Sequence, residues 1–140
     1  MIRAIAAALL AAATSGCLEQ TGPTMEPGKD CMTCHGEVAP AWTVAGTVFS
    51  SPDAGADAGF EGTQVLVLDS DGKALTLSAN SSGNFYTAEP LAFPIRVELQ
   101  RGNKRMAMSD SPPLGSCNHC HSPTPPEGES DVPGRLFVPQ

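Results

Sequence analysis

One five-residue pattern occurs twice in this chain, and it constrains the fold more than any other feature. The pattern is Cys-x-x-Cys-His, found at residues 31–35 as CMTCH and at residues 117–121 as CNHCH. Cysteines three positions apart lie on one side of a single helical turn, and the histidine that follows comes off the same turn. Each copy therefore predicts a one-turn segment that presents two sulfurs and one imidazole together. With only 5 Cys and 3 His in 140 residues, two matches are not expected by chance.

This spacing is the attachment signature of c-type haem. Two sulfurs on one turn can reach the two vinyl groups at one edge of a porphyrin and form thioethers, and the imidazole can bind the iron as the proximal axial ligand. The sequence therefore predicts two covalently bound c-type haems. Cys31, Cys34, Cys117 and Cys120 are assigned to the thioethers, and His35 and His121 to the proximal iron positions.

The same cysteines allow two other readings. Two Cys-x-x-Cys pairs can bind one structural zinc ion through four thiolates, or they can close as two short disulfides. Neither arrangement needs a histidine after each pair, so the paired histidines favour haem. Zinc and disulfides stay open as alternatives at this level.

The amino terminus resembles a bacterial lipoprotein signal. Arg3 is the only charge in residues 1–16, and residues 4–13 form an alanine-rich apolar run. That run is too short to span a bilayer but is typical of the apolar region of a secretory signal peptide. Small residues lead into Cys17, which such signals lipidate, although Thr14 stands where leucine is usual.

The resemblance implies a signal peptide at 1–16, a lipidated Cys17 and a polar, flexible tether at 17–30 that contains proline and glycine. It also implies export to the periplasmic or cell-surface face of a bacterial membrane, with a lipid anchor. Bacterial c-type haem is attached outside the cytoplasm, so export agrees with the haem prediction.

The chain is acidic, with 8 Lys+Arg against 15 Asp+Glu and a formal net charge of −7. This balance argues against nucleic acid as a partner, because nucleic-acid binding depends on basic side chains that neutralise phosphates. It favours basic or neutral redox partner proteins, which an acidic surface attracts at long range.

Between the two motifs the pattern is β. Short runs rich in Val, Leu, Phe and Thr, separated by turn residues, predict strands at 43–49, 64–68, 74–79, 84–87, 95–100 and 105–108. The predicted fold class is mainly β: a small antiparallel β-sandwich at 43–109, flanked by loop or short-helix haem segments at 31–42 and 110–122. A proline-rich tail follows at 123–140 and is expected to form either a terminal strand or a cover over the second haem.

This middle segment resembles the carboxypeptidase regulatory-like (transthyretin-like) β-sandwich family. The residues that carry the resemblance are GTV at 46–48, GTQV at 62–65, DSDG at 69–72, NSSGNF at 80–85 and PIRVEL at 94–99. The resemblance implies a non-catalytic accessory or binding module, so the sandwich is expected to serve as a scaffold. The DSDG segment is expected to be a hairpin turn, since it lacks the remaining ligands of a calcium loop.

The distal iron ligands are less constrained by the sequence. Candidates are His119, Met106 and Met108, together with Met25 and Met32. His119 cannot bind opposite His121 on the same haem, because the motif holds it on the proximal side. We expect an exposed imidazole there, or a ligand to the other haem or to another molecule. Met106 and Met108 lie two apart on a strand and face the same way, so both could approach one haem, although core packing is the commoner role for such a pair.

The combined expectation is an exported, lipid-anchored dihaem cytochrome that carries single electrons and is not an enzyme, with self-association through exposed haems as a further option. Two alternatives belong to other classes. One is a haem enzyme acting on peroxide or another small molecule at an open iron position. The other is a regulatory-like binding module whose Cys-x-x-Cys pairs hold zinc or form disulfides.

Overall fold

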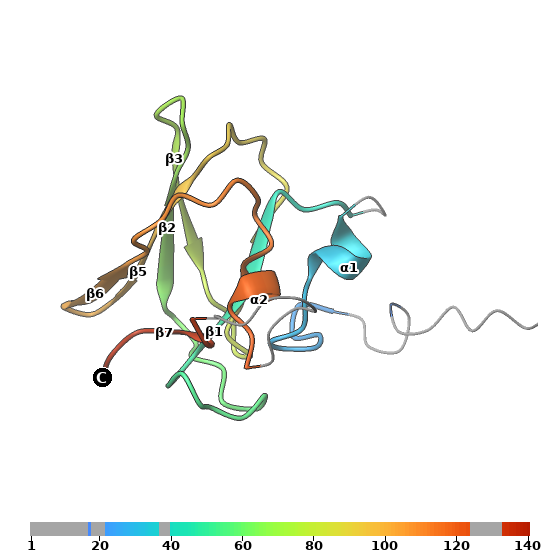
Figure 1. Ribbon diagram of the computed structural model, residues 1–140. Helices are drawn as coiled ribbons and strands as arrows, with labels where there is room; N and C mark the ends of the chain where they lie inside the picture. Colours follow the sequence, from blue (N-terminus) through green and yellow to red (C-terminus); the bar gives the residue numbers. More distant parts are fainter. Residues whose placement is uncertain (1–16, 18–21, 37–39, 124–132) are drawn as a thin grey trace, which may run out of the picture.

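The computed structural model describes residues 17, 22–36, 40–123 and 133–140, and within these residues the chain is mainly β (Figure 1). The strands are β1 (Val44–Phe49), β2 (Gln64–Leu68), β3 (Ala74–Ser78), β4 (Asn84–Thr87), β5 (Arg96–Arg101), β6 (Lys104–Ala107) and β7 (Leu136–Phe137). The helices are α1 (Met32–His35) and α2 (Cys117–Cys120), each a single turn. The six expected strands are confirmed, with ends that differ by at most one residue. The expected signal peptide lies outside the described residues.

The strands form two sheets. One has the order β4-β1-β7 and the other β3-β2-β5-β6. Alternate residues of β2 and β5 are buried, and register places Val65 opposite Leu99 and Val67 opposite Val97. These side chains pack with Val44, Val48, Phe85, Ile95 and Val138 in one hydrophobic core. Two sheets around one core are consistent with a β-sandwich. The arrangement is not purely antiparallel, because β7 pairs parallel to β1.

The turn between β2 and β3 is organised by one carboxylate. Asp69 accepts hydrogen bonds from the backbone N–H groups of Ala92 at 3.1 Å, Lys73 at 2.7 Å and Asp71 at 3.0 Å. These donors, the Ala92 N–H first among them, hold the pKa of Asp69 below its usual value. Gly72 has φ +88°, which suits a glycine in a tight turn. The DSDG segment is thus a hairpin turn, as expected.

Strand β1 is buried along its whole length, and α2 packs against it. Both helices lie on the same side of the sheets, beside β1, and β6 lies on the opposite side (Figure 1). The first and last strands of the middle segment, β1 and β6, are not neighbours, because they belong to different sheets. The motifs meet because Ser116 forms a parallel bridge with Ala45.

The segment expected to be a flexible tether differs from that expectation, whereas the tail forms a terminal strand, one of its two expected roles. Part of the expected tether is bonded to the sheet: Gly28 N–H donates to Thr47 Oγ1 at 2.9 Å, and Asn84 Nδ2 donates to Met25 O at 2.7 Å. The proline-rich tail supplies β7, and Val138 is fully buried. The β-sandwich therefore includes residues beyond the predicted 43–109 segment.

Candidate functional site

The second motif forms one helical turn that docks closely on β1. Within the turn, the His121 N–H donates to Cys117 O at 2.9 Å. Two glycines permit the approach: a Cβ at Gly46 would lie 2.8 Å from Cys117 Cβ, and one at Gly115 would lie 1.9 Å from Thr43 O. Both distances are too short for real atoms. Because both positions are glycine and carry no side chain, the first cysteine of the motif can pack directly against the sheet.

His121 has the electronic form that a metal ligand needs. Its Nδ1 lies 3.1 Å from the carbonyl oxygen of Gly134, so Nδ1 carries the proton and Nε2 carries the lone pair. Nε2 is buried and has no hydrogen-bond partner. Burial lowers the pKa of His121 below its usual value, partly opposed by the Gly134 carbonyl. The imidazole is therefore neutral at pH 7, with one nitrogen oriented by a carbonyl and the other unsatisfied.

A cavity of about 530 Å³ adjoins the second motif. Its walls include Cys117, Cys120 and His121 from the motif and Met106 and Met108 from the end of β6 and the residue that follows. Apolar side chains of β5 and β7, Leu99, Leu136 and Phe137, complete much of the lining. The volume falls within the range of protein sites for cofactors and other small molecules. The fold thus gathers the predicted thioether sulfurs, the proximal histidine and two predicted distal ligands around one cavity.

The first motif has the same turn but different surroundings. His35 N–H donates to Cys31 O at 2.9 Å, and His35 Nδ1 lies 2.9 Å from Pro40 O, which repeats the carbonyl orientation found at His121. The His35 ring stacks on Trp42 with centroids 3.6 Å apart, and Trp42 stacks on Tyr86 at 4.2 Å. The cavity beside this motif is only about 50 Å³. Among the described residues, a cavity of cofactor size therefore adjoins the second motif, and a much smaller one adjoins the first.

A disulfide joins Cys17 to Cys34. This bond differs from the sequence expectation, which assigned Cys17 to a lipid and Cys34 to a thioether. Each sulfur can form only one of these bonds, so the disulfide and the two modifications describe different covalent forms of the chain. Cys31, Cys117 and Cys120 are not in disulfides.

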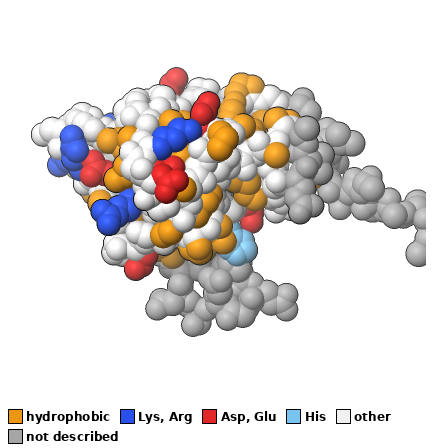
Figure 2. Space-filling model, turned by 90° about the horizontal axis from the view of Figure 1, so that it is seen from above, with side chains coloured by type: hydrophobic (Ala, Val, Ile, Leu, Met, Phe, Trp, Pro, Cys, Tyr) orange, Lys and Arg blue, Asp and Glu red, His pale blue; other side chains and the backbone are white. Residues whose placement is uncertain are grey.

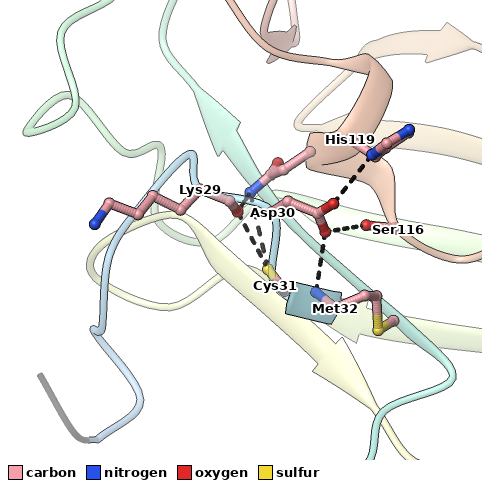
Figure 3. Close-up of polar contacts among 7 residues, drawn as sticks. Lys29, Asp30, Cys31, Met32, Ser116 and His119 are labelled. Atoms are coloured by element: carbon pink, nitrogen blue, oxygen red, sulfur yellow. Dashed lines mark hydrogen bonds and ion pairs between the residues drawn. The ribbon is translucent and has the colours of Figure 1, made fainter. Parts of the chain in front are cut away.

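The two motifs are bonded directly to each other through Asp30 (Figure 3). Its carboxylate accepts hydrogen bonds from the Ser116 hydroxyl and the Met32 N–H and lies 3.1 Å from His119 Nδ1. The His119 side chain is 44% exposed and is directed toward the first motif. This agrees with the expected exposed imidazole, and it places His119 next to the other haem segment.

Asn118 is the functional residue that the sequence analysis missed. It is 2% exposed, and its amide Nδ2 donates to Lys29 O at 2.8 Å and to Thr47 Oγ1 at 3.0 Å, while its Oδ1 accepts from the Thr47 N–H at 2.9 Å. Asn118 therefore ties the second motif to β1 and to the segment before Cys31. Asn118 is one of the two x positions of the Cys-x-x-Cys-His pattern, where haem attachment requires no particular residue, so the pattern alone could not predict its role.

No group of three or more His, Cys, Asp or Glu side chains is placed to hold one metal ion within the described ranges. Neither Cys-x-x-Cys pair closes on itself, since Cys34 is bonded to Cys17 and the other motif cysteines keep their thiols.

Burial makes two of the thiols unusually weak acids. It raises the pKa of Cys31 to about 11, assisted by the neighbouring Asp30 charge, and the pKa of Cys117 to about 12, assisted by Cys31 and Cys120. In the unfolded chain both thiols ionise near pH 9. Between these values the unfolded state has fewer bound protons than the folded state, so stability falls as the pH rises.

We therefore expect the haem-free protein to lose stability above about pH 9. The loss is at most about 2 kcal/mol per thiol by about pH 10.5. Denaturant titrations of the unmodified chain and of Cys117→Ala across this range measure it, and the variant should show a shallower decline. The haem-loaded protein should not show this loss of stability at high pH, because its thioethers do not titrate. If the unmodified chain, Cys117→Ala and the haem-loaded protein all lose stability at the same rate as the pH rises, Cys117 is not buried as described.

No protein-family model, curated protein or solved structure matches this chain. The resemblances to a lipoprotein signal and to the regulatory-like family therefore stay predictions. Among the described residues, no helix is long and apolar enough to cross a membrane.

Proposed function

We propose that this chain is an exported dihaem c-type cytochrome that transfers single electrons. The observation that carries the proposal is the cavity at the second motif, which Cys117, Cys120 and His121 line together, with His121 Nε2 lacking a hydrogen-bond partner. An unsatisfied buried nitrogen is costly, and an iron atom would satisfy it. The cysteines and histidine, the volume and the largely apolar lining of this cavity together support a haem here.

When bound, haem supplies an iron that alternates between the ferric and ferrous states. Cys117 and Cys120 hold the ring to the chain, and His121 binds the iron. The Gly134 carbonyl orients His121 and increases its basicity through Nδ1. The apolar side chains of β5 and β7 limit water near the iron, which, with the axial ligands, sets the reduction potential.

Met106 and Met108 favour electron transfer over the haem-enzyme alternative. Both line the cavity, so either thioether could serve as a second protein ligand if haem is bound there. A second protein ligand would compete with peroxide for the iron, and a methionine in that role would raise the reduction potential relative to a second histidine.

The first haem is proposed at Cys31, Cys34 and His35. Attachment at Cys34 requires that its sulfur is not bonded to Cys17, and lipidation of Cys17 has the same requirement. Because Asp30 joins the two motif segments, the two attachment points are in contact, which favours rapid electron exchange between the haems.

The net charge of −7 supports a basic or neutral redox partner. On the face shown in Figure 2, basic side chains occur singly or in small groups beside acidic ones, without a continuous basic patch. Nucleic acid is therefore not proposed as a partner.

An absorption spectrum with haem quantitation tests the proposal. Protein expressed with its own leader in a host competent for haem attachment should show reduced c-type bands and two haems per chain that survive denaturation. The intact mass should show both haems and a lipid on Cys17. A colourless protein, or one that carries zinc, would exclude the proposed function, and a retained Cys17–Cys34 disulfide would exclude both the lipid and the Cys34 thioether.

A further inference from the structure

Two aromatic rings stack in line on the histidine of the first motif. The His35 imidazole lies against Trp42, with ring centroids 3.6 Å apart and an angle of 15° between the planes. Trp42 lies in turn against Tyr86, at 4.2 Å and 9°. All three rings line the small cavity beside the first motif, together with Cys31 and Cys34. The stack therefore belongs to the same site as the cysteines of this motif.

The sheet holds the outer two rings in place. Tyr86 belongs to β4, where it is paired in register with Ala45 of β1. Trp42 lies two residues before β1, and Thr43, the residue between, donates its N–H to Thr87 O at 2.7 Å. Two neighbouring strands thus fix Trp42 and Tyr86 relative to each other.

His35 is bound to this frame through its backbone and through one ring nitrogen. The Trp42 N–H donates to His35 O at 2.8 Å, and His35 Nδ1 lies 2.9 Å from Pro40 O. Because a carbonyl oxygen can only accept, Nδ1 carries the proton and Nε2 keeps the lone pair of the neutral imidazole. One hydrogen bond at the edge of a ring does not fix the plane of that ring, whereas a second ring stacked on its face does.

We propose that Trp42, supported by Tyr86, is a positioning residue that fixes the plane of the His35 imidazole for metal binding through Nε2. This inference rests on the proposed function, under which the metal is the iron of the first haem. Groups that orient a metal-binding histidine contribute to its affinity for the metal. His121 has a carbonyl partner at Gly134 but, among the described residues, no ring stacked on it. The effect of Trp42 should therefore be confined to one of the two haems.

Removing the stack should disturb the first haem and leave the second unchanged. Trp42→Ala keeps Cys31, Cys34 and His35, so the covalent haem should stay at two per chain. Without the stacked ring, His35 can bind the iron in several orientations, and its affinity for the iron should fall by about tenfold or more. Electron paramagnetic resonance of the oxidised protein should then show a broadened signal with a high-spin fraction for the first haem only.

The haem-free chain gives a second readout that does not depend on iron. The ring protons of His35 lie over the face of Trp42, so their nuclear magnetic resonance signals should be shifted upfield relative to those of His119 and His121. Trp42→Ala should abolish this shift. Trp42→Phe keeps a ring at the position, so it should preserve part of the shift and restore the sharp signal of the first haem.

Phe60→Ala is the matched control for loss of an aromatic side chain. Phe60 packs against the hydrophobic core but lines the cavity of neither motif. This variant should lose stability without a selective change at the first haem. Haem quantitation and thermal unfolding show whether each variant is loaded and folded.

The outcomes separate the two proposals. Two haems with unaltered iron signals in Trp42→Ala would overturn the role of Trp42 and leave the cytochrome intact. The same changes in Trp42→Ala and Phe60→Ala would also overturn it, since the effect would then be a general loss of stability. Absence of covalent haem from the unmodified protein would overturn both, because the stack would have no iron ligand to position. Loss of the first haem in Trp42→Ala but not in Trp42→Phe would support the role of the stacked ring.

Discussion

Changing Cys117 and Cys120 together to alanine is expected to halve the covalent haem, from two haems per chain to one. The reason is chemical: without these sulfurs no thioether can form at the second motif, although His121 remains. Changing Cys31 and Cys34 to alanine should halve the count at the other site. Haem that stays on the chain after denaturation is the quantity to measure, because a retained histidine can still hold haem non-covalently.

The two variants are expected to differ in which haem they keep. The variant that lacks Cys31 and Cys34 retains the cavity of about 530 Å³, with Met106 and Met108 in its wall. Its remaining haem, at the second motif, is therefore the one expected to show a spectrum of methionine ligation. The variant that lacks Cys117 and Cys120 should lose that spectrum. Magnetic resonance of the iron in each single-haem form assigns the axial ligands.

Cys17→Ala is the control for the disulfide. If Cys34 carries a thioether in the mature protein, this change should leave the haem count at two and alter only membrane attachment. If the Cys17–Cys34 bond persists, the change should free Cys34 and alter the first site alone. An unchanged count after removal of either motif pair would exclude that pair as an attachment site.

Much of the β framework could be predicted from the sequence because its signals are local. Alternating apolar residues and glycine-containing turns gave all six strands of the middle segment, and the Cys-x-x-Cys-His spacing gave the two one-turn helices. The DSDG hairpin followed from the same turn chemistry. These features depend on residues that are close in the chain, so no knowledge of the packing was needed.

The site could be predicted only in part, because what completes it comes from distant segments. Cys117, Cys120 and His121 were identified from their spacing, but Leu136 and Phe137 reach the same cavity through the pairing of β7 with β1, which rests on only two residue pairs. The Cys17–Cys34 bond likewise depends on where residues 22–30 pack. Nothing in the local pattern distinguishes these long-range contacts from the expected tether and tail.

Asn118 explains why the motif positions written as x need not be equivalent. In the first motif those positions are Met32 and Thr33, and neither is fully buried. In the second motif the corresponding Asn118 lies between β1 and the backbone of Lys29. The fold therefore uses one Cys-x-x-Cys-His motif to hold the other in place.

Changing Asn118 to alanine is accordingly expected to destabilise the whole site. The change leaves the buried Thr47 N–H and the Lys29 carbonyl without their partner, at a cost of about 2 to 4 kcal/mol. For a chain of this size that corresponds to a fall of about 10 °C in Tm. Thermal unfolding of the haem-loaded protein measures the loss. Asn103→Ala, in the exposed β5–β6 turn, is the matched control and should change little.

A double-mutant cycle with Thr47→Val separates this holding role from a general packing defect. Asn118 and Thr47 exchange bonds in both directions, so the combined variant should lose less stability than the sum of the single variants. Strict additivity would mean that these bonds do not act as a unit. If Asn118→Ala unfolds at the same temperature as Asn103→Ala, the second motif is not held by this residue. Because Asn118 belongs to the second motif and contacts Cys31 of the first, its loss should also alter the potentials of both haems if the proposed function holds, which no change confined to one cavity would do.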